Sequence, residues 1–169
     1  HFSPLVGWVH EKDHTYFNEG QLASKGIEQM AETGSTSTLV SELQALVDNN
    51  EGLSTYTGSG LNSGVGTISI DITVNLDFPA VSLASMLAPS PDWFVACINI
   101  NLLDEDGGFV IEKTVVGHVY DAGTEEGDTF SFNNEESCPQ EPIREIVEMP
   151  LGNGTFVKSS LCIVVFTKL

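Results

Sequence analysis

The chain has 169 residues, 41% of them hydrophobic, which is enough for a single domain with its own core. Its charge is lopsided, with 24 Asp and Glu against 6 Lys and Arg and a formal net charge of −18. A negative field of this strength repels phosphate backbones and anionic membranes, so nucleic-acid binding is excluded. No apolar run approaches the length of a membrane span, and we expect none to cross a membrane.

The first third of the chain predicts loops and short helices. Residues 1–20 carry scattered aromatic side chains and are expected to form a loop. Residues 21–32 predict a helix that Gly34 ends, because glycine tolerates a left-handed cap. Residues 38–48 predict a second helix from leucines at helical spacing, and residues 52–66, rich in Gly, Ser and Asn, predict a loop.

From residue 67 onward the hydrophobic pattern changes to a period of two, which is typical of strands. Apolar and polar residues alternate over residues 67–76, which predicts a half-buried strand. Further strands are expected over residues 81–87, 93–103 and 109–120, in a short stretch within 121–134, and over 156–168. Antiparallel strands joined by acidic turns predict an all-β sandwich of two sheets, as one domain over residues 1–169.

Sequence motifs of common enzyme classes are absent. The chain has no G-x-S-x-G elbow, no P-loop and no H-E-x-x-H pair. An EF-hand frame that begins at Asp104 places Val115 where the calcium loop needs a glutamate. Asp and Glu are too numerous for any one pair to indicate glycosidase chemistry. We therefore expect a protein that is not an enzyme.

Two acidic turns are the better candidates for a binding site. Asp92 lies in Ser90-Pro91-Asp92-Trp93, while Asp121, Glu125 and Glu126 lie in a turn that contains glycine. Calcium takes about six to eight oxygen ligands, often carboxylates from loops at one end of a β-sandwich. Two carboxylates four positions apart around a glycine can converge on one ion, to which another loop adds a third. The alternative is ordinary solvated charge on turns.

The cysteines and one sequon bear on the compartment. Cys97, Cys138 and Cys162 allow at most one internal disulfide, in any pairing. Cys97 and Cys162 fall in expected strands, whereas Cys138 falls in a loop and is the thiol we expect to be most reachable. Asn153-Gly154-Thr155 is a glycosylation sequon, which is usable only in a secreted chain. These features favour an extracellular protein.

Several segments match the motifs of a known protein family. The most specific is Ser85-Met86-Leu87-Ala88-Pro89-Ser90-Pro91-Asp92-Trp93-Phe94-Val95, which is similar to the signature SMIAPSPDWFVG of the spondin N-terminal domain family. Residues 121–127 resemble its DAGTDSG, and residues 139–144 resemble P-x-E-P-I-R. Upstream, residues 1–7 resemble HFSPLIG, and residues 20–34 resemble GGLAS-x-G-I followed by AE-x-G.

The resemblance implies a C2-like antiparallel β-sandwich of about eight strands, with one or two short helices in the N-terminal third. It also implies a secreted, non-catalytic module that binds calcium and mediates extracellular matrix or cell-surface adhesion. The calcium carboxylates of the family fall on Asp92, Asp121 and Glu125, of which the last is aspartate in the usual motif. Two departures are Ala96-Cys97, where the family has a glycine-containing stretch, and a start that would leave one strand of the family before residue 1. The implied partner is an extracellular protein or glycan, and the acidic charge is compatible with an integrin-type receptor.

A second class of function stays open, namely an extracellular carrier of a small apolar ligand such as a carotenoid pigment or a lipid. The feature behind it is the set of aromatic residues Trp8, Tyr16 and Phe17 in an isolated domain. The alternative is that these rings belong to the core. A visible absorption band in the native protein would favour the carrier.

Overall fold

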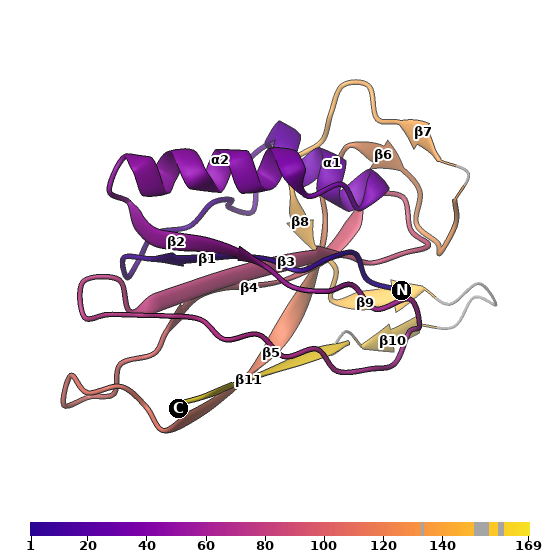
Figure 1. Ribbon diagram of the computed structural model, residues 1–169. Helices are drawn as coiled ribbons and strands as arrows, with labels where there is room; N and C mark the ends of the chain where they lie inside the picture. The colour runs from indigo at the N-terminus through magenta and orange to yellow at the C-terminus, as the bar shows by residue number, and fades with distance from the viewer. Residues whose placement is uncertain (133, 151–155, 159–160) are drawn as a thin grey trace.

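The computed structural model describes residues 1–132, 134–150, 156–158 and 161–169, and its centre is one antiparallel sheet of seven strands (Figure 1). The order across the sheet is β11-β5-β4-β3-β1-β2, and β8 pairs with β5 beside this path. The strands are β1 (Val6–His10), β2 (Gly52–Thr57), β3 (Ala80–Met86), β4 (Trp93–Asn101), β5 (Glu112–Asp121), β8 (Arg144–Glu145) and β11 (Cys162–Thr167). The prediction of an antiparallel, mostly β chain is confirmed.

Two helices, α1 (Lys25–Thr33) and α2 (Ser37–Asp48), lie on one face of this sheet (Figure 1). The Ser24 hydroxyl caps α1 by accepting the N–H of Ile27, and Gly34 ends it with a φ of 73°. Glu42 of α2 accepts hydrogen bonds from the Ser24 hydroxyl at 2.6 Å and from the Gly26 N–H at 2.8 Å. Both predicted helices are therefore confirmed, and the described residues after position 50 contain no other.

The core beneath the helices contains the aromatic residues of the N-terminal segment. Trp8 and Phe17 are buried, and Tyr16 packs against the same cluster. The Phe17 ring lies edge-on to Phe94 at 5.3 Å and to Tyr120 at 5.1 Å between centroids. The idea that these rings form a ligand cradle is wrong, because they fill the space between the helices and the sheet.

Three sequence predictions about local structure need correction. Residues 1–20 were expected to form a loop, yet β1 lies between β2 and β3 and is buried on both faces, so it shows no alternation. The loop expected over residues 52–66 contains β2, whose Gly52 is required because a Cβ there would lie 2.2 Å from Trp8 Nε1. Residues 67–76 form no strand: Ile72 and Val74 pack inward, but no ladder pairs this segment.

The C-terminal part of the chain forms several short strands, where the sequence pattern indicates one long strand. The strand expected over residues 156–168 occurs as β10 (Phe156–Lys158) and β11. β10 pairs with β9 (Glu148–Pro150), and β6 (Glu125–Glu126) pairs with β7 (Glu135–Glu136). The sandwich itself is not confirmed, because outside the main sheet the described strands form only these two-stranded ribbons. Neither helix in the described part of the chain is long and apolar enough to cross a membrane.

Candidate functional site

The turn between β3 and β4 places Asp92 in the protein interior. The Ser90 hydroxyl donates to the carbonyl of Leu87 and accepts the N–H of Trp93 at 3.1 Å, which closes the turn. Asp92 is 0% exposed. A carboxylate in this position needs compensating donors or a cation, because burial of an unpaired charge is strongly unfavourable.

One oxygen of Asp92 organises the turn that follows β5. Oδ2 accepts hydrogen bonds from the Thr124 N–H at 2.6 Å, the Thr124 hydroxyl at 3.2 Å and the Glu125 N–H at 3.1 Å. The other oxygen, Oδ1, is buried and has no hydrogen-bond partner among the residues that the structure describes. Burial raises the pKa of Asp92, and the three hydrogen bonds to Oδ2 oppose that rise.

Gly123 allows this turn to form. Its φ is +74°, and a Cβ there would lie 2.1 Å from the carbonyl oxygen of Glu141. The carbonyl of Gly123 in turn accepts the N–H of Glu141 at 2.8 Å, and that of Thr124 accepts the N–H of Ser137 at 2.9 Å. The turn is therefore fixed against the segment that leads to β8.

Asp121, the last residue of β5, is the second buried acid of the site. It is 5% exposed, its Oδ1 accepts the Gly123 N–H at 2.8 Å, and its Oδ2 accepts from Arg144 at 2.7 Å. Burial raises the pKa of Asp121 to about 6, the negative charge of Asp92 adds to the rise, and Arg144 opposes it. The two carboxyl groups are thus close enough to disfavour each other's charge.

Glu125 adds a third acid at the rim. Burial, and then the charge of Glu32, raises its pKa. In the ribbon of β6 and β7, Glu125 pairs with Glu136 and Glu126 pairs with Glu135, so like charges face each other across the strands. Directly opposed like charges destabilise a ladder unless a cation intervenes.

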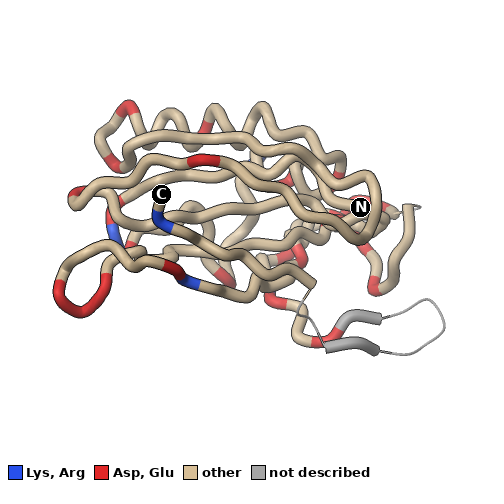
Figure 2. Tube along the Cα trace, turned by 60° about the horizontal axis from the view of Figure 1, so that its bottom comes forward, with Lys and Arg blue, Asp and Glu red and all other residues tan. Residues whose placement is uncertain are grey.

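A surface pocket of about 360 Å³ opens beside Asp121 and Glu125, whereas Asp92 is buried and does not line it. Its charged lining residues are acidic apart from one guanidinium, and the lining comprises Asp121, Gly123, Glu125, Glu126, Gly127, Asp128, Ser137, Glu141 and Arg144. Acidic residues, in red, outnumber basic ones, in blue, along the described part of the trace in Figure 2. The pocket therefore concentrates a negative field that attracts cations.

The three predicted calcium ligands are only partly assembled. Asp92 and Asp121 lie together, while Glu125 is joined to Asp92 through its backbone N–H rather than its carboxylate. Within the described ranges, no group of three or more His, Cys, Asp and Glu side chains is already arranged to hold a metal. The unpartnered Oδ1 of Asp92 nevertheless fits a cation, since it is a buried hard oxygen beside a second carboxylate.

The sequence profile of the Spondin_N family matches residues 1–154. The chain belongs to the spondin N-terminal domain family. Human (Homo sapiens) spondin-2 is 31% identical over 146 residues, which cover 86% of this chain and 44% of spondin-2. Chicken (Gallus gallus) spondin-1 is 30% identical over 163 residues, which cover 92% of this chain and 20% of spondin-1. The spondin domain thus spans less than half the length of these curated relatives.

One acid of this spondin domain was not identified from the sequence as a site residue. The negative charge of Glu32, on α1, raises the pKa of both Asp92 and Glu125, so its carboxylate acts on the same site from the helix side. The signal was present in Ala31-Glu32-Thr33-Gly34, a segment that supports the family resemblance. It was interpreted only as the end of a helix, because nothing local indicates what a helical glutamate faces.

The remaining predicted site residues of the spondin domain are the cysteines and the sequon. Cys97 is buried, Cys138 is exposed and Cys162 is intermediate, and all are free thiols. Burial raises the pKa of Cys97 to about 12. Asn153 lies outside the described residues, so glycosylation there stays a prediction.

Proposed function

We propose that this spondin domain is a secreted, non-catalytic, calcium-binding module that attaches to an extracellular matrix or cell-surface partner. The observation that carries the proposal is Asp92 Oδ1, a buried carboxylate oxygen with no hydrogen-bond partner in the described part of the chain, which lies beside Asp121 and next to an acidic pocket. Such an oxygen is costly in a folded protein unless a cation or a proton satisfies it.

Each acid has its own role in the proposed site. Asp92 Oδ1 is the fixed ligand, since Oδ2 is held by the turn that contains Thr124. Asp121 supplies a second carboxylate, whose ionised form Arg144 favours against the effect of burial on its pKa. Glu125 and Glu32 complete the negative environment from the rim and from α1. Calcium supplies two positive charges and accepts about six to eight oxygen ligands, so backbone carbonyls and water fill the remaining positions.

The proposed partner is an extracellular protein or glycan. With a net charge of −18, the chain repels anionic polymers on its own. A bound calcium ion offsets part of the negative charge at the pocket and leaves coordination positions for an acidic group of the partner. An integrin-type receptor, which reads an acidic residue together with a metal, fits the same chemistry. The membership of the chain in the spondin family supports this assignment.

The test of the site is a thermal melt in calcium and in chelator. Calcium that binds only the folded state stabilises it by about 2.7 kcal/mol at a hundredfold excess over Kd, and we expect a rise in Tm of several degrees. Asp92→Asn should remove most of that rise, because it deletes the charge and nearly preserves the shape. Asp77→Asn, at an exposed loop aspartate, is the matched control and should keep it.

An unchanged Tm for the wild-type protein, together with metal analysis that finds no retained calcium, would overturn the site. The partner is tested separately by binding of wild type and Asp92→Asn to matrix-coated surfaces and to integrin-bearing cells. Calcium-dependent attachment that Asp92→Asn abolishes is the expected result, and attachment that chelator leaves intact contradicts it.

A further inference from the structure

Strands β4 and β5 separate half-way along their length. They pair from Trp93 with Asp121 to Ala96 with His118, and no further. Beyond that point β5 pairs with β11 on its other side, while β4 continues only with β3. The β3–β4 ladder shifts register in the same region, where Asn99 has a φ of 50°, so a bulge turns β4 away from β5.

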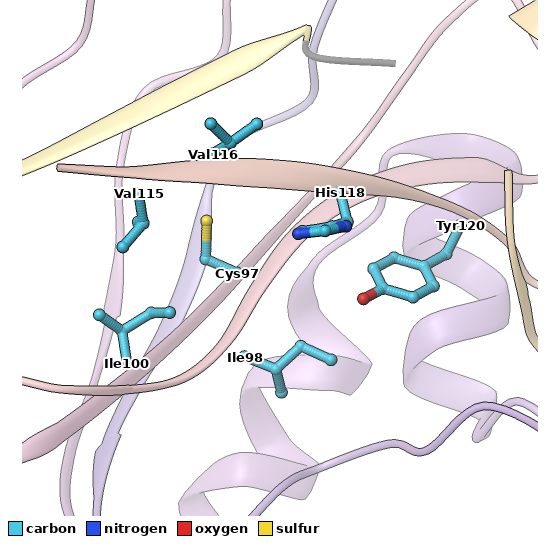
Figure 3. A pocket seen from close by; sticks show the side chains of 7 residues that line it. All are labelled: Cys97, Ile98, Ile100, Val115, Val116, His118 and Tyr120. Carbon is cyan, nitrogen blue, oxygen red and sulfur yellow. The ribbon is translucent and has the colours of Figure 1, made fainter. Parts of the chain in front are cut away.

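The opening between the two strands is a pocket of about 430 Å³ (Figure 3). Its walls are mainly aliphatic: Ile98 and Ile100 come from β4, and Val115 and Val116 come from β5. At its outer end the Lys113 ammonium crosses between the strands and donates to the carbonyl of Asn101 at 2.8 Å. The volume falls within the range of about 300–1,000 Å³ that small-molecule sites occupy.

The apolar lining continues onto the surface. Val116 is 46% exposed, and on the same face Ile163, its partner in β11, is 67% exposed and Val165 is 53% exposed. α1 and α2 pack against β1, β3 and β4, and the outer part of β5 and β11 lies beyond them (Figure 1). A pocket that opens onto a row of exposed aliphatic side chains marks a binding site for an apolar molecule.

The polar residues that line the pocket lie at the end where β4 and β5 still pair, and the His118 side chain there is 55% exposed. His118 Nδ1 bonds to Glu145 Oε1 at 2.6 Å, which fixes the imidazole ring. Nε2 bonds to none of the described residues, and the ring lies between the side chains of Cys97 and Tyr120 (Figure 3). The Lys113 ammonium already donates to the Asn101 carbonyl, whereas Glu145 and the net charge of −18 disfavour an anion beside His118, so the end of the pocket at His118 is complementary to an uncharged group.

We propose that this opening binds a neutral, elongated apolar small molecule with one hydrogen-bonding group, which meets His118 Nε2. The aliphatic walls bury the body of the ligand, and the ring of His118 orients its polar end. The site shares no residue with the acidic pocket, so it works with or without calcium.

The first experiment compares two fluorescent probes of nearly equal shape, neutral N-phenyl-1-naphthylamine and its anionic relative 8-anilino-1-naphthalenesulfonate. We expect saturable, one-site binding of the neutral probe with a blue-shifted emission, and at least about tenfold weaker binding of the sulfonate. The same result is expected in calcium and in chelator, so its failure is distinct from failure of the calcium site. Absence of saturable binding, or equal affinity for both probes, would overturn the proposal.

Variants then locate the site. Val116→Asp places a charge at the mouth of the pocket, and Val116→Trp fills it without charge, so both should weaken the neutral probe at least about tenfold. Thr114→Asp is the matched control, since Thr114 is exposed on the same face of β5 but does not line the pocket. Circular dichroism and melts confirm that each variant folds. Equal loss in Thr114→Asp, or full binding in Val116→Trp, contradicts the location.

The roles of His118 and Glu145 in the selectivity for neutral ligands are tested separately. His118→Phe keeps a ring but loses the acceptor, and should weaken the neutral probe several-fold. Glu145→Gln removes the charge behind the imidazole, and should strengthen binding of the sulfonate while the neutral probe binds as before. An unchanged preference between the two probes in Glu145→Gln would show that this carboxylate does not set the selectivity for neutral ligands.

Discussion

Arg144 Nη2 donates a hydrogen bond to Asp121 Oδ2 at 2.7 Å, and the two residues also pair in register across β8 and β5. This guanidinium is the only basic side chain among the residues that line the acidic pocket. It offsets part of the repulsion between Asp121 and Asp92 in the absence of a metal. At the proposed site, calcium is therefore expected to meet a carboxylate that Arg144 already orients, which reduces the cost of assembling the site.

As the pH falls, the free energy of unfolding should rise in chelator and should fall in calcium. Burial, with Asp92, raises the pKa of Asp121 from 3.8 to about 6. The folded state thus binds this proton more tightly than the unfolded state, and the resulting stability is present below the unfolded pKa and lost as the pH rises through about 6. In chelator, a change from about pH 7 to about pH 5 should add about 1 kcal/mol to the free energy of unfolding through this group.

In calcium, protons compete with the metal for the same oxygens, so the increment that calcium adds should shrink over that range. Urea unfolding at a series of pH values measures how the free energy of unfolding depends on pH in chelator and in calcium. Asp121→Asn should flatten the two curves, whereas Asp128→Asn, at an exposed acid of the same pocket, should leave them in place. A chelator slope that survives in Asp121→Asn would assign the effect to other acids.

Removal of the Glu32 carboxylate should stabilise the domain in chelator but weaken its binding of calcium. Its charge raises the pKa of Asp92 and of Glu125, so Glu32→Gln relieves repulsion and stabilises the domain in chelator. In calcium the same change deletes attraction and should weaken binding several-fold, as isothermal titration calorimetry will measure. Glu28→Gln, one helical turn earlier and paired with Lys25, should leave the calcium affinity as it is. If Glu32→Gln and Glu28→Gln have equal affinities for calcium, Glu32 is excluded from the site.

Gly123→Ala should destabilise the domain through the turn that follows β5, and Gly107→Ala should destabilise it less. Both glycines have positive φ, +74° and +80°, but a Cβ at Gly123 meets the backbone of Glu141 while one at Gly107 meets open space. We expect a loss of about 1–2 kcal/mol for Gly107→Ala from its backbone conformation alone, and about 3 kcal/mol or more for Gly123→Ala. Chemical denaturation in chelator measures both, and similar losses would show that the turn can shift.

The three thiols should react at very different rates. Cys138 is exposed, whereas burial raises the pKa of Cys97 to about 12 and also raises that of Cys162. Because the thiolate is the reactive form, native protein should give one fast thiol with a disulfide reagent, and denatured protein should give all three. Cys138→Ser should remove the fast phase, and Cys162→Ser should not. Fewer than three thiols in denaturant without reductant would reveal a disulfide.

The parts of the fold that could be predicted from sequence are those with a single buried face. α2 shows leucines at helical spacing, and the left-handed cap at Gly34 marks the end of α1. β1 could not be predicted in this way, because a strand between two others with both faces covered has no alternating pattern. The opposite error occurred at residues 67–76, where alternation indicates which side chains face inward but not whether a neighbouring strand pairs.

The residues of the candidate site could likewise be predicted only in part from the sequence. Asp92 and Asp121 follow from short motifs at the ends of expected strands, and the structure brings them together. Glu32 comes from a helix distant in sequence, and only the fold reveals that its charge reaches Asp92. The role of Arg144 was equally hidden, since a motif that contains an arginine does not reveal which acid it meets.

The position of β1 constrains how the domain is made on the ribosome. Its Val6 pairs with Thr57 on one side and with Ala84 on the other, so this strand, which is synthesised before β2 and β3, waits for β3 before its second edge is hydrogen-bonded. Until then the nascent chain exposes an apolar segment with an open edge, which invites aggregation and chaperone binding. A stalled chain that ends before β3 should be cleaved rapidly in pulse proteolysis, and one that extends through β5 should gain protection.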